Sequence, residues 1–294
     1  PSDYGKVVFS GVSGATNFGV HASSTLAVGT YGAVMSGLSA NNIASGISGT
    51  VASPNACTDV NGTTATFTSD CADLDISGNN ANVTINSGVK ISGEGDLDWE
   101  LDNSSGVLWD LVVTAQKDVI NSGNNTSFFN AGNIAASTTH GINNKGSFIE
   151  LSNKGIITSI DEYSIYNDTS ATITSLTNSG VISSTNNNSI NNIGLLTSLT
   201  NTGTISAGGD NGIKNTGTID YILNTGTISA GNNTGIFNDG GTITTLDNSQ
   251  SNLTYKGALP TNYNAIISSP SDYGKVVFSG VSGATNFGVH ASST

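Results

Sequence analysis

The chain has 294 residues, of which 10% are charged, and its formal net charge is −13. All eight basic residues are lysines. Nucleic-acid binding depends on basic patches and on arginine as the bidentate reader of bases and phosphates, so this composition excludes a nucleic-acid partner. It also disfavours an anionic membrane surface. The 294 residues contain no run of about 18 apolar residues, so the sequence predicts no helical membrane span within them.

Residues 1–115 are predicted to form an all-β module of short strands separated by Gly/Ser turns. Its most regular element is a hairpin: 96–102 alternates strictly between polar and apolar residues, 103–106 turns, and 107–114 returns as an apolar strand. Two arrangements fit these strands: an all-β sandwich, or a curved sheet that continues into the β-solenoid predicted below for residues 116–254. The other expected strands are Lys6–Phe9, Asn17–His21, Tyr31–Met35, Thr63–Thr68 and Asn82–Ile85.

Two cysteines, Cys57 and Cys71, flank a turn signal at 59–62. A disulfide between them would stabilise the fold by about 3 kcal/mol and would indicate an oxidising, extracytoplasmic compartment. The alternative is a metal site, which needs four ligands, and no histidine lies nearby in the sequence.

The acidic residues Asp96, Asp98, Glu100 and Asp102 recur every second position and therefore share one face of the predicted strand. Carboxylate oxygens are ligands for Ca²⁺, which makes this face the one candidate metal site. The alternative is a solvated strand face whose negative charge protects a sheet edge. No other cofactor is expected.

Residues 116–254 are predicted to form a parallel β-solenoid, because two series of asparagines recur about every 23 residues. The spacings in the first series are 23, 23, 25, 23 and 23. Asparagine tolerates the backbone conformations of turns, and stacked asparagines can pair as amide ladders. The first series is Asn121, Asn144, Asn167, Asn192, Asn215 and Asn238, and the second is Asn130, Asn153, Asn178, Asn201, Asn224 and Asn248.

Apolar residues keep the same register as these asparagines. Two positions before the first series stand Val119, Ile142, Ile165, Ile190, Ile213 and Ile236, and two before the second stand Phe128, Leu151, Leu176, Leu199, Ile222 and Leu246. Such columns are the core that stacked coils require. The predicted fold is therefore all-β: a solenoid of about six coils plus the second all-β module. A leucine-rich repeat has a similar period, but its L-x-x-L-x-L frame is missing.

Residues 255–294 begin a second copy of the first module, since residues 270–294 are identical to residues 1–25. This duplication indicates a segment of a tandem array. Two arrangements remain open: the array continues covalently, or 270–294 insert into a neighbouring subunit in the place of its own residues 1–25.

The repeats resemble a known family. GIKNTGTI, LNTGTISAG and LTNTGTISAG are similar to the passenger repeats of bacterial autotransporter-type surface proteins, which are right-handed β-helices. LPTNYNAIISSPSDYGKVVFSGVSG and NSSGVLWDLVV resemble the modules that alternate with such repeats in very long bacterial surface proteins. The resemblance implies display outside a bacterial cell and, by analogy, type V secretion.

An enzymatic function also has to be considered, because many β-helix proteins cleave polysaccharides with a pair of carboxylates. No catalytic residue is predicted here. The histidines His21, His140 and His290 show no His-x-x-x-His spacing, and no Gly-x-Ser-x-Gly motif is present. The acids of the solenoid are scattered: Glu150, Asp161, Glu162, Asp168, Asp210, Asp220, Asp239 and Asp247.

The sequence thus predicts a non-enzymatic, extracellular structural protein that forms or extends a bacterial surface fibre, with further copies of itself as its partner. The alternative is an adhesin stalk that binds cell-surface glycans or neighbouring cells. An adhesin would present exposed aromatic residues, and those of the solenoid form no clear stripe along the sequence: Phe129, Tyr163, Tyr166, Tyr221 and Phe237.

Overall fold

The computed structural model describes most of the chain. It describes residues 6–8, 10, 13–15, 18, 20, 29–36, 38, 40–42, 48–52, 56–92, 96–102, 108–115 and 119–294. Within this set, only the backbone is described for 29–33, 40, 48–52, 92, 96–102 and 108–115.

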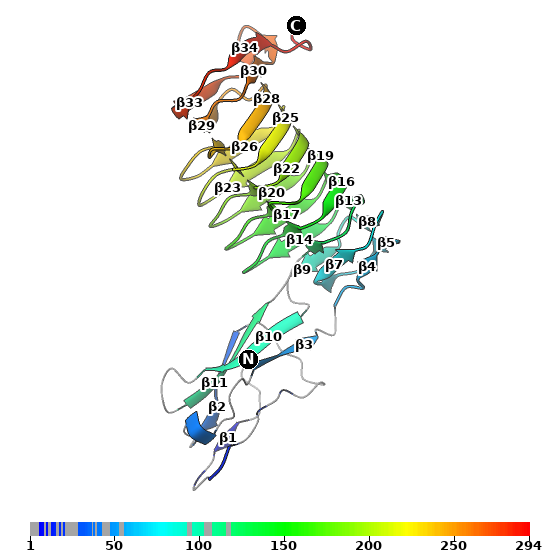
Figure 1. The fold of residues 1–294 in the computed structure, drawn as a ribbon, viewed down its shortest axis with the longest axis vertical. Helices are drawn as coiled ribbons and strands as arrows, with labels where there is room; N and C mark the ends of the chain where they lie inside the picture. Colours follow the sequence, from blue (N-terminus) through cyan, green and yellow to red (C-terminus); the bar gives the residue numbers. More distant parts are fainter. Residues whose placement is uncertain are drawn as a thin grey trace.

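The predicted parallel β-solenoid is confirmed, and it has three faces (Figure 1). Face 1 consists of β4 (Val60–Asn61), β7 (Leu74–Ser77), β12 (Val119–Asn121), β15 (Ile142–Asn144), β18 (Ile165–Asn167), β21 (Ile190–Asn192), β24 (Ile213–Asn215), β27 (Ile236–Asn238), β29 (Leu253–Ala258) and β33 (Val276–Ser282). Face 2 consists of β5 (Thr64–Phe67), β8 (Asn82–Ile85), β13 (Thr126–Asn130), β16 (Ser147–Asn153), β19 (Thr172–Asn178), β22 (Leu195–Asn201), β25 (Thr218–Asn224), β28 (Thr242–Asn248), β30 (Asn262–Ala265) and β34 (Asn286–Val289). Face 3 consists of β6 (Cys71–Ala72), β9 (Lys90–Ser92), β14 (Asn133–Ala136), β17 (Ile156–Ser159), β20 (Val181–Ser184), β23 (Thr204–Ala207) and β26 (Thr227–Ala230).

The core runs along the solenoid axis as stacked columns of aliphatic and aromatic side chains. In the face 1 column, Ile142 pairs with Ile165 and Ile165 with Ile190, so like side chains stack on like. The face 2 column repeats this with Leu151, Leu176 and Leu199. All twelve residues of the two predicted columns are buried. Alternate residues of each strand point inward, which explains why these positions are apolar while their neighbours vary in character, as Asn143, Ser152 and Thr177 show.

Two of the three corners, after face 1 and after face 2, are closed by an asparagine followed by a tight turn. At the corner after β16, the N–H groups of Lys154 and Gly155 both donate to the carbonyl oxygen of Asn130 in the preceding coil, at 2.8 and 3.2 Å. A Cβ atom on Gly155 would overlap the carbonyl oxygen of Gly132 below it. Glycine is therefore required here by the close approach of two coils.

The solenoid extends beyond the 116–254 segment on both sides. Residues 60–92 supply two further coils below β12, β13 and β14, and β29, β30, β33 and β34 supply further strands above β27 and β28. Faces 1 and 2 thus have ten strands each and face 3 has seven, where the sequence predicts about six coils. The asparagine spacing does not reveal the N-terminal coils, because Ile76 and Ile85 occupy the asparagine positions directly below Asn121 and Asn130.

Residues 93–118 are an insertion between two coils that pair directly through β9 and β14. The insertion carries the hairpin predicted from the alternating pattern: β10 (Asp96–Asp102) pairs antiparallel with β11 (Leu108–Ala115). These strands belong to a five-stranded sheet, in the order β1 (Val7–Val8), β2 (Gly29–Ser36), β11, β10 and β3 (Ser48–Ala52). The predicted strand 17–21 falls largely outside the described residues.

The remaining elements are short. A 3-10 turn, η1, spans Ala40–Asn42, and β31 (Ile267–Ser269) pairs antiparallel with β32 (Asp272–Tyr273) between the last two coils. Within the described part of the chain, no helix has the length and apolar character needed to cross a membrane.

Candidate functional site

The first asparagine series forms a continuous amide ladder at the corner between faces 1 and 2. Each Nδ2 donates to the Oδ1 of the next asparagine at 2.7–2.8 Å, from Asn121 up to Asn238. All six side chains are buried. Because every bond has the same direction, the amide dipoles align along the axis and strengthen one another.

The second series forms a parallel ladder at the corner between faces 2 and 3. It runs from Asn130 up to Asn248 with Nδ2 to Oδ1 distances of 2.8–2.9 Å. The same amides also bind the backbone: in the middle of the ladder, Asn178 Nδ2 lies 3.1 Å from the carbonyl oxygen of Thr204. Buried amides that are paired in this way hold successive coils in one register.

Both ladders end where another residue takes the asparagine position. Gly257 stands above Asn238 and Ala265 stands above Asn248. The last Nδ2 groups are satisfied by carbonyl oxygens instead, those of Ala258 and Gln250, both at 2.8 Å. The ladders therefore form a closed element in which the terminal donors have partners.

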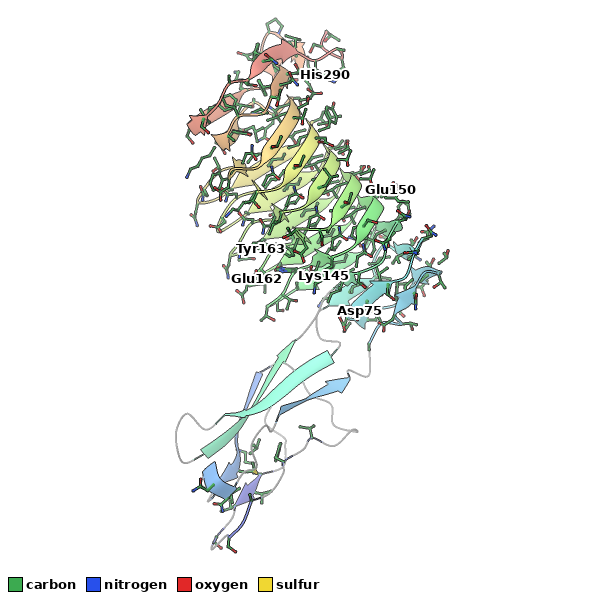
Figure 2. All side chains as sticks on the ribbon, viewed as in Figure 1. Asp75, Lys145, Glu150, Glu162, Tyr163 and His290 are labelled. Carbon is green, nitrogen blue, oxygen red and sulfur yellow. A yellow bond between two sulfur atoms is a disulfide. The ribbon has the colours of Figure 1, made fainter. Side chains whose placement is uncertain are left out.

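The outer side of face 1 carries an aromatic cluster that we call the His140 cluster, formed by His140, Tyr163 and Tyr166. The ring centroids of His140 lie 5.1 Å from Tyr163 and 4.7 Å from Tyr166, and the two tyrosines are 5.6 Å apart. Figure 2 shows Tyr163 beside Glu162 on the flank of the solenoid, with Lys145 nearby. Sequence spacing did not join these residues, because Tyr163 lies in a loop and Tyr166 in β18.

Burial dominates the electrostatics of this cluster. Burial, assisted by the nearby Lys145 ammonium and partly opposed by the Asp168 carboxylate, lowers the pKa of His140 from its ordinary 6.5 to about 4. His140 Nδ1 is buried without a hydrogen-bond partner and lies 3.9 Å from Glu162 Oε2. Burial also raises the pKa of both tyrosines. The cluster is thus uncharged at neutral pH, as a stacking platform requires.

Higher on the same face, cations and an aromatic ring alternate. The Nζ atoms of Lys256 and Lys214 lie 5.0 and 5.8 Å from the centroid of the Phe237 ring. Lys214 Nζ also lies 3.2 Å from Asp239 Oδ2. Tyr166, Lys214 and Phe237 occupy one outward column of face 1, whereas Phe129 and Tyr221 lie on face 2.

For β10, the strand with the predicted acidic face, the structure describes only the backbone. β10 is flanked by β11 on one side and β3 on the other, so Asp96, Asp98, Glu100 and Asp102 do not lie on a sheet edge. The edge-protection interpretation is therefore wrong for this strand. The side chains lie outside the described part, and Ca²⁺ binding stays a prediction. Elsewhere in the described chain, no cluster of three or more metal-ligating side chains occurs.

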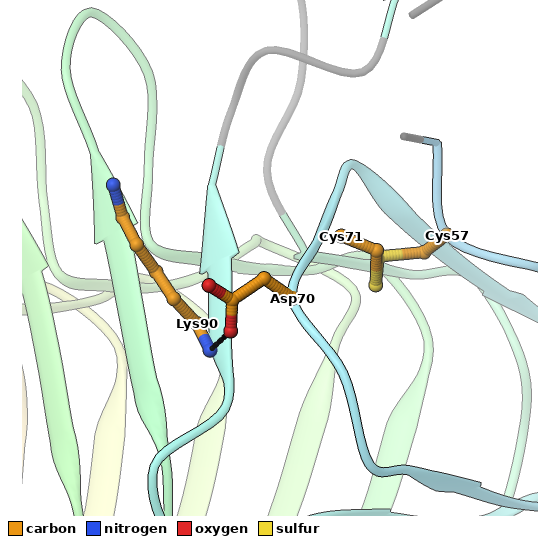
Figure 3. Close-up of a disulfide and its surroundings, with 4 residues drawn as sticks. All are labelled: Cys57, Asp70, Cys71 and Lys90. Atoms are coloured by element: carbon orange, nitrogen blue, oxygen red, sulfur yellow. Dashed lines mark hydrogen bonds between the residues drawn. A yellow bond between two sulfur atoms is a disulfide. The ribbon is translucent and has the colours of Figure 1, made fainter. Parts of the chain in front are cut away.

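The predicted disulfide between Cys57 and Cys71 is present (Figure 3). It closes the first coil, where the N–H of Cys57 donates to the carbonyl oxygen of Ala72 at 2.7 Å. Beside Cys71, Asp70 Oδ1 accepts a hydrogen bond at 2.9 Å from the N–H of Lys90 in the following coil. These contacts fix the N-terminal end of the solenoid. Val60, in the first coil, is buried.

The scattered acids of the solenoid have separate surroundings. Asp161 accepts a hydrogen bond from Asn186 at 2.9 Å. Asp247, buried on face 2, accepts from the Tyr221 hydroxyl at 2.5 Å and from Asn264 at 2.7 Å, and lies 3.4 Å from His290 Nε2. This buried network was not predicted, because its members come from three coils and one terminal loop. It fastens the C-terminal strand β34 to the coils below.

Comparison with known proteins gives no relative: no protein-family model, no curated protein and no solved structure matches the chain.

Replacing Asn178 by alanine is expected to lower the free energy of unfolding by about 1–3 kcal/mol, because Asn153 loses an acceptor and Asn201 loses a donor in a buried ladder. Urea denaturation followed by circular dichroism measures the change. The matched control is Asn232→Ala at an exposed turn, which is expected to stay within about 0.5 kcal/mol of the original protein. Equal effects at the two positions would contradict a stabilising ladder.

Acidification is expected to destabilise the fold through His140. The folded chain binds fewer protons than the unfolded chain between pH 6.5 and pH 4, so the free energy of unfolding falls as pH falls through this window, by up to about 3 kcal/mol. Urea titrations at pH 7 and pH 4.5 test this. His140→Phe keeps a ring in the cluster and removes the titration, so its pH dependence is expected to be smaller. An unchanged dependence would assign the effect to other groups.

Proposed function

We propose that the chain is an extracellular structural protein whose repeated β-solenoid units form or extend a bacterial surface fibre. The observation that carries the proposal is the pair of uninterrupted asparagine ladders, each spanning six coils with buried, aligned amides. Such ladders hold many short strands in one rigid register along a single axis. A rod of this kind suits a passive mechanical role, and no catalytic step is assigned to it.

The duplication supports an array of such units. A sequence that returns unchanged after 269 residues supplies identical ends to successive units. In repeat proteins each unit contacts mainly its neighbours, so an array can grow along one axis without a new kind of interface. This arrangement makes further copies of the chain its main partner.

Two features support an extracellular location. The disulfide between Cys57 and Cys71 is of a kind that persists in oxidising surroundings, which supports a location outside the cytoplasm. The likeness of the repeats to autotransporter-type passengers points the same way and suggests a bacterial surface. The net charge of −13 keeps such rods soluble and mutually repelling along their flanks, which favours contact through their ends.

The fibre is tested on native material from the producing cell. Electron microscopy is expected to show long filaments of uniform width without any added ligand. The mass after complete denaturation and reduction then separates the two ways of building them: many multiples of the repeat indicate a covalent array, and 29.7 kDa indicates separate subunits. Isolated short particles of single-chain mass would contradict the fibre.

A second candidate function is glycan binding by an adhesin stalk, and the His140 cluster is the observation that favours it. Three stacked rings on the flank of a rod offer flat apolar surface, which can pack against the apolar side of a sugar ring. Glu162 and Lys145 beside them offer hydrogen-bond partners for hydroxyl groups.

Binding to a panel of immobilised glycans tests this second function. Tyr166→Ala is expected to weaken any binding about tenfold, the loss that one ring contact of about 1.4 kcal/mol produces. The control is Phe129→Ala, an aromatic residue on face 2 away from the cluster. Binding that is equally strong in both variants, or absent from the panel, would rule out the cluster as a glycan site.

A further inference from the structure

The last coil of the solenoid has an open edge. β33 and β34 are the final strands of faces 1 and 2, and no described strand pairs with their outer sides. Lys275 bonds to the coil below through both its N–H, which donates to Gln250, and its carbonyl oxygen, which accepts from Leu253. Successive residues of a strand direct these groups to opposite sides, so those of Val276 face the open edge.

The hydrophobic core is also open at this coil. Phe278 stacks on Tyr255, and Phe287 stacks on Tyr263, so both rings continue the two core columns. Tyr255 and Tyr263 are buried, yet Phe278 is 37% and Phe287 73% exposed. The ring centroids of Tyr263 and Phe287 are 5.7 Å apart. These side chains have the position of core residues, and their rings are exposed on the outer side of the last described coil.

The sequence of β33 occurs a second time in the chain, in another structural setting. Val276 and Val277 correspond to Val7 and Val8, which form β1. β1 pairs in parallel with β2, with Val7 opposite Met35. β1 has two residues, and Val7 and Val8 are 50% and 80% exposed, whereas Met35 is buried. The strand that β2 holds is therefore short and weakly packed.

We propose that β33 of one copy docks in parallel on β2 of a second copy and replaces that copy's own β1. The register follows from the identical sequence: Val276 lies opposite Met35 of the second copy, and Val277 opposite its Ser36. The exchange substitutes one VVFSGVS segment for another, so β2 keeps the same contacts. The docked strand gains a partner on its open edge while β29 keeps its partner on the other.

A second copy of this chain is the occupant that the observations favour. β2 already accepts this sequence in parallel within the chain, so the β2 of a second copy fits the open edge of β33. Because the tail of one copy enters the head of the next, the contact is heterologous, and its repetition along one axis builds an open filament. The inference rests on the proposed fibre and names its interface.

The test is sedimentation velocity on the full 294-residue chain over a wide concentration range. The original protein is expected to form head-to-tail oligomers whose size grows with concentration. Val276→Pro removes the N–H on the open edge and is expected to weaken association at least tenfold. The matched variant Val7→Pro makes the same change in the identical sequence of β1 and is expected to strengthen association, because it weakens the competing strand.

A cross-link provides a second readout that does not depend on how well the proline variants fold. Ser36→Cys combined with Val277→Cys is expected to give disulfide-linked multimers under mild oxidation, and mass spectrometry identifies the joined peptides. Ser36→Cys combined with Val8→Cys is expected to link within one chain and serves as the control for the register.

Two results would overturn the proposal: a chain that stays monomeric at every concentration, and proline variants that affect association equally. Either result would leave the fibre itself intact if native filaments have a denatured mass of many repeats, because the units would then be joined covalently. Absence of filaments in native material would remove the fibre and the interface together.

Discussion

In-register pairing between successive coils is the constraint on which the rest of this structure depends. A buried amide is stable only when its donors and acceptors are used, and Asn178 uses both through Asn153 below and Asn201 above. A shift by one residue would move every inward side chain of a strand outward and would separate all of these amides at once. The sequence repeat exists because each coil must offer the same residue at the same place.

The coils nevertheless differ in length, and the differences lie where pairing is not needed. Two extra residues separate Asn167 from Asn178, compared with Asn144 and Asn153 in the coil below. They form a turn in which the N–H of Ala171 donates to the carbonyl oxygen of Asp168 at 2.9 Å, and Thr172 then resumes its pairing with Ser147. The insertion of 93–118 follows the same rule on a larger scale, since β9 and β14 still pair across it. Length can vary at a corner because the strands fix the register.

The sequence predicts the central coils well and their ends poorly for one physical reason. Asparagine and isoleucine recur together only while both the turn and the ladder are present. In the coil below Asn121, Leu74 and Val83 continue the two apolar columns, but Ile76 and Ile85 take the asparagine positions, so the pattern loses its clearest marker. The His140 cluster and the Asp247 network lie beyond prediction for another reason, because their members meet across different coils and loops. The duplicated segment shows the limit most clearly, since Val7 and Val276 have one sequence and different strand partners.

The two ends of the solenoid are unlike, and this gives the rod a direction. At the N-terminal end the disulfide between Cys57 and Cys71 ties the first coil covalently, and Val60 in that coil is buried. At the C-terminal end Phe278 and Phe287 leave the core columns uncovered. A stack of identical coils has no internal reason to stop, so its ends must be closed by something other than another coil of the same kind. The disulfide ties the first coil covalently, and the last coil presents a strand whose sequence the chain also pairs with β2. A unit built in this way is suited to add neighbours at one end, which a polar filament requires.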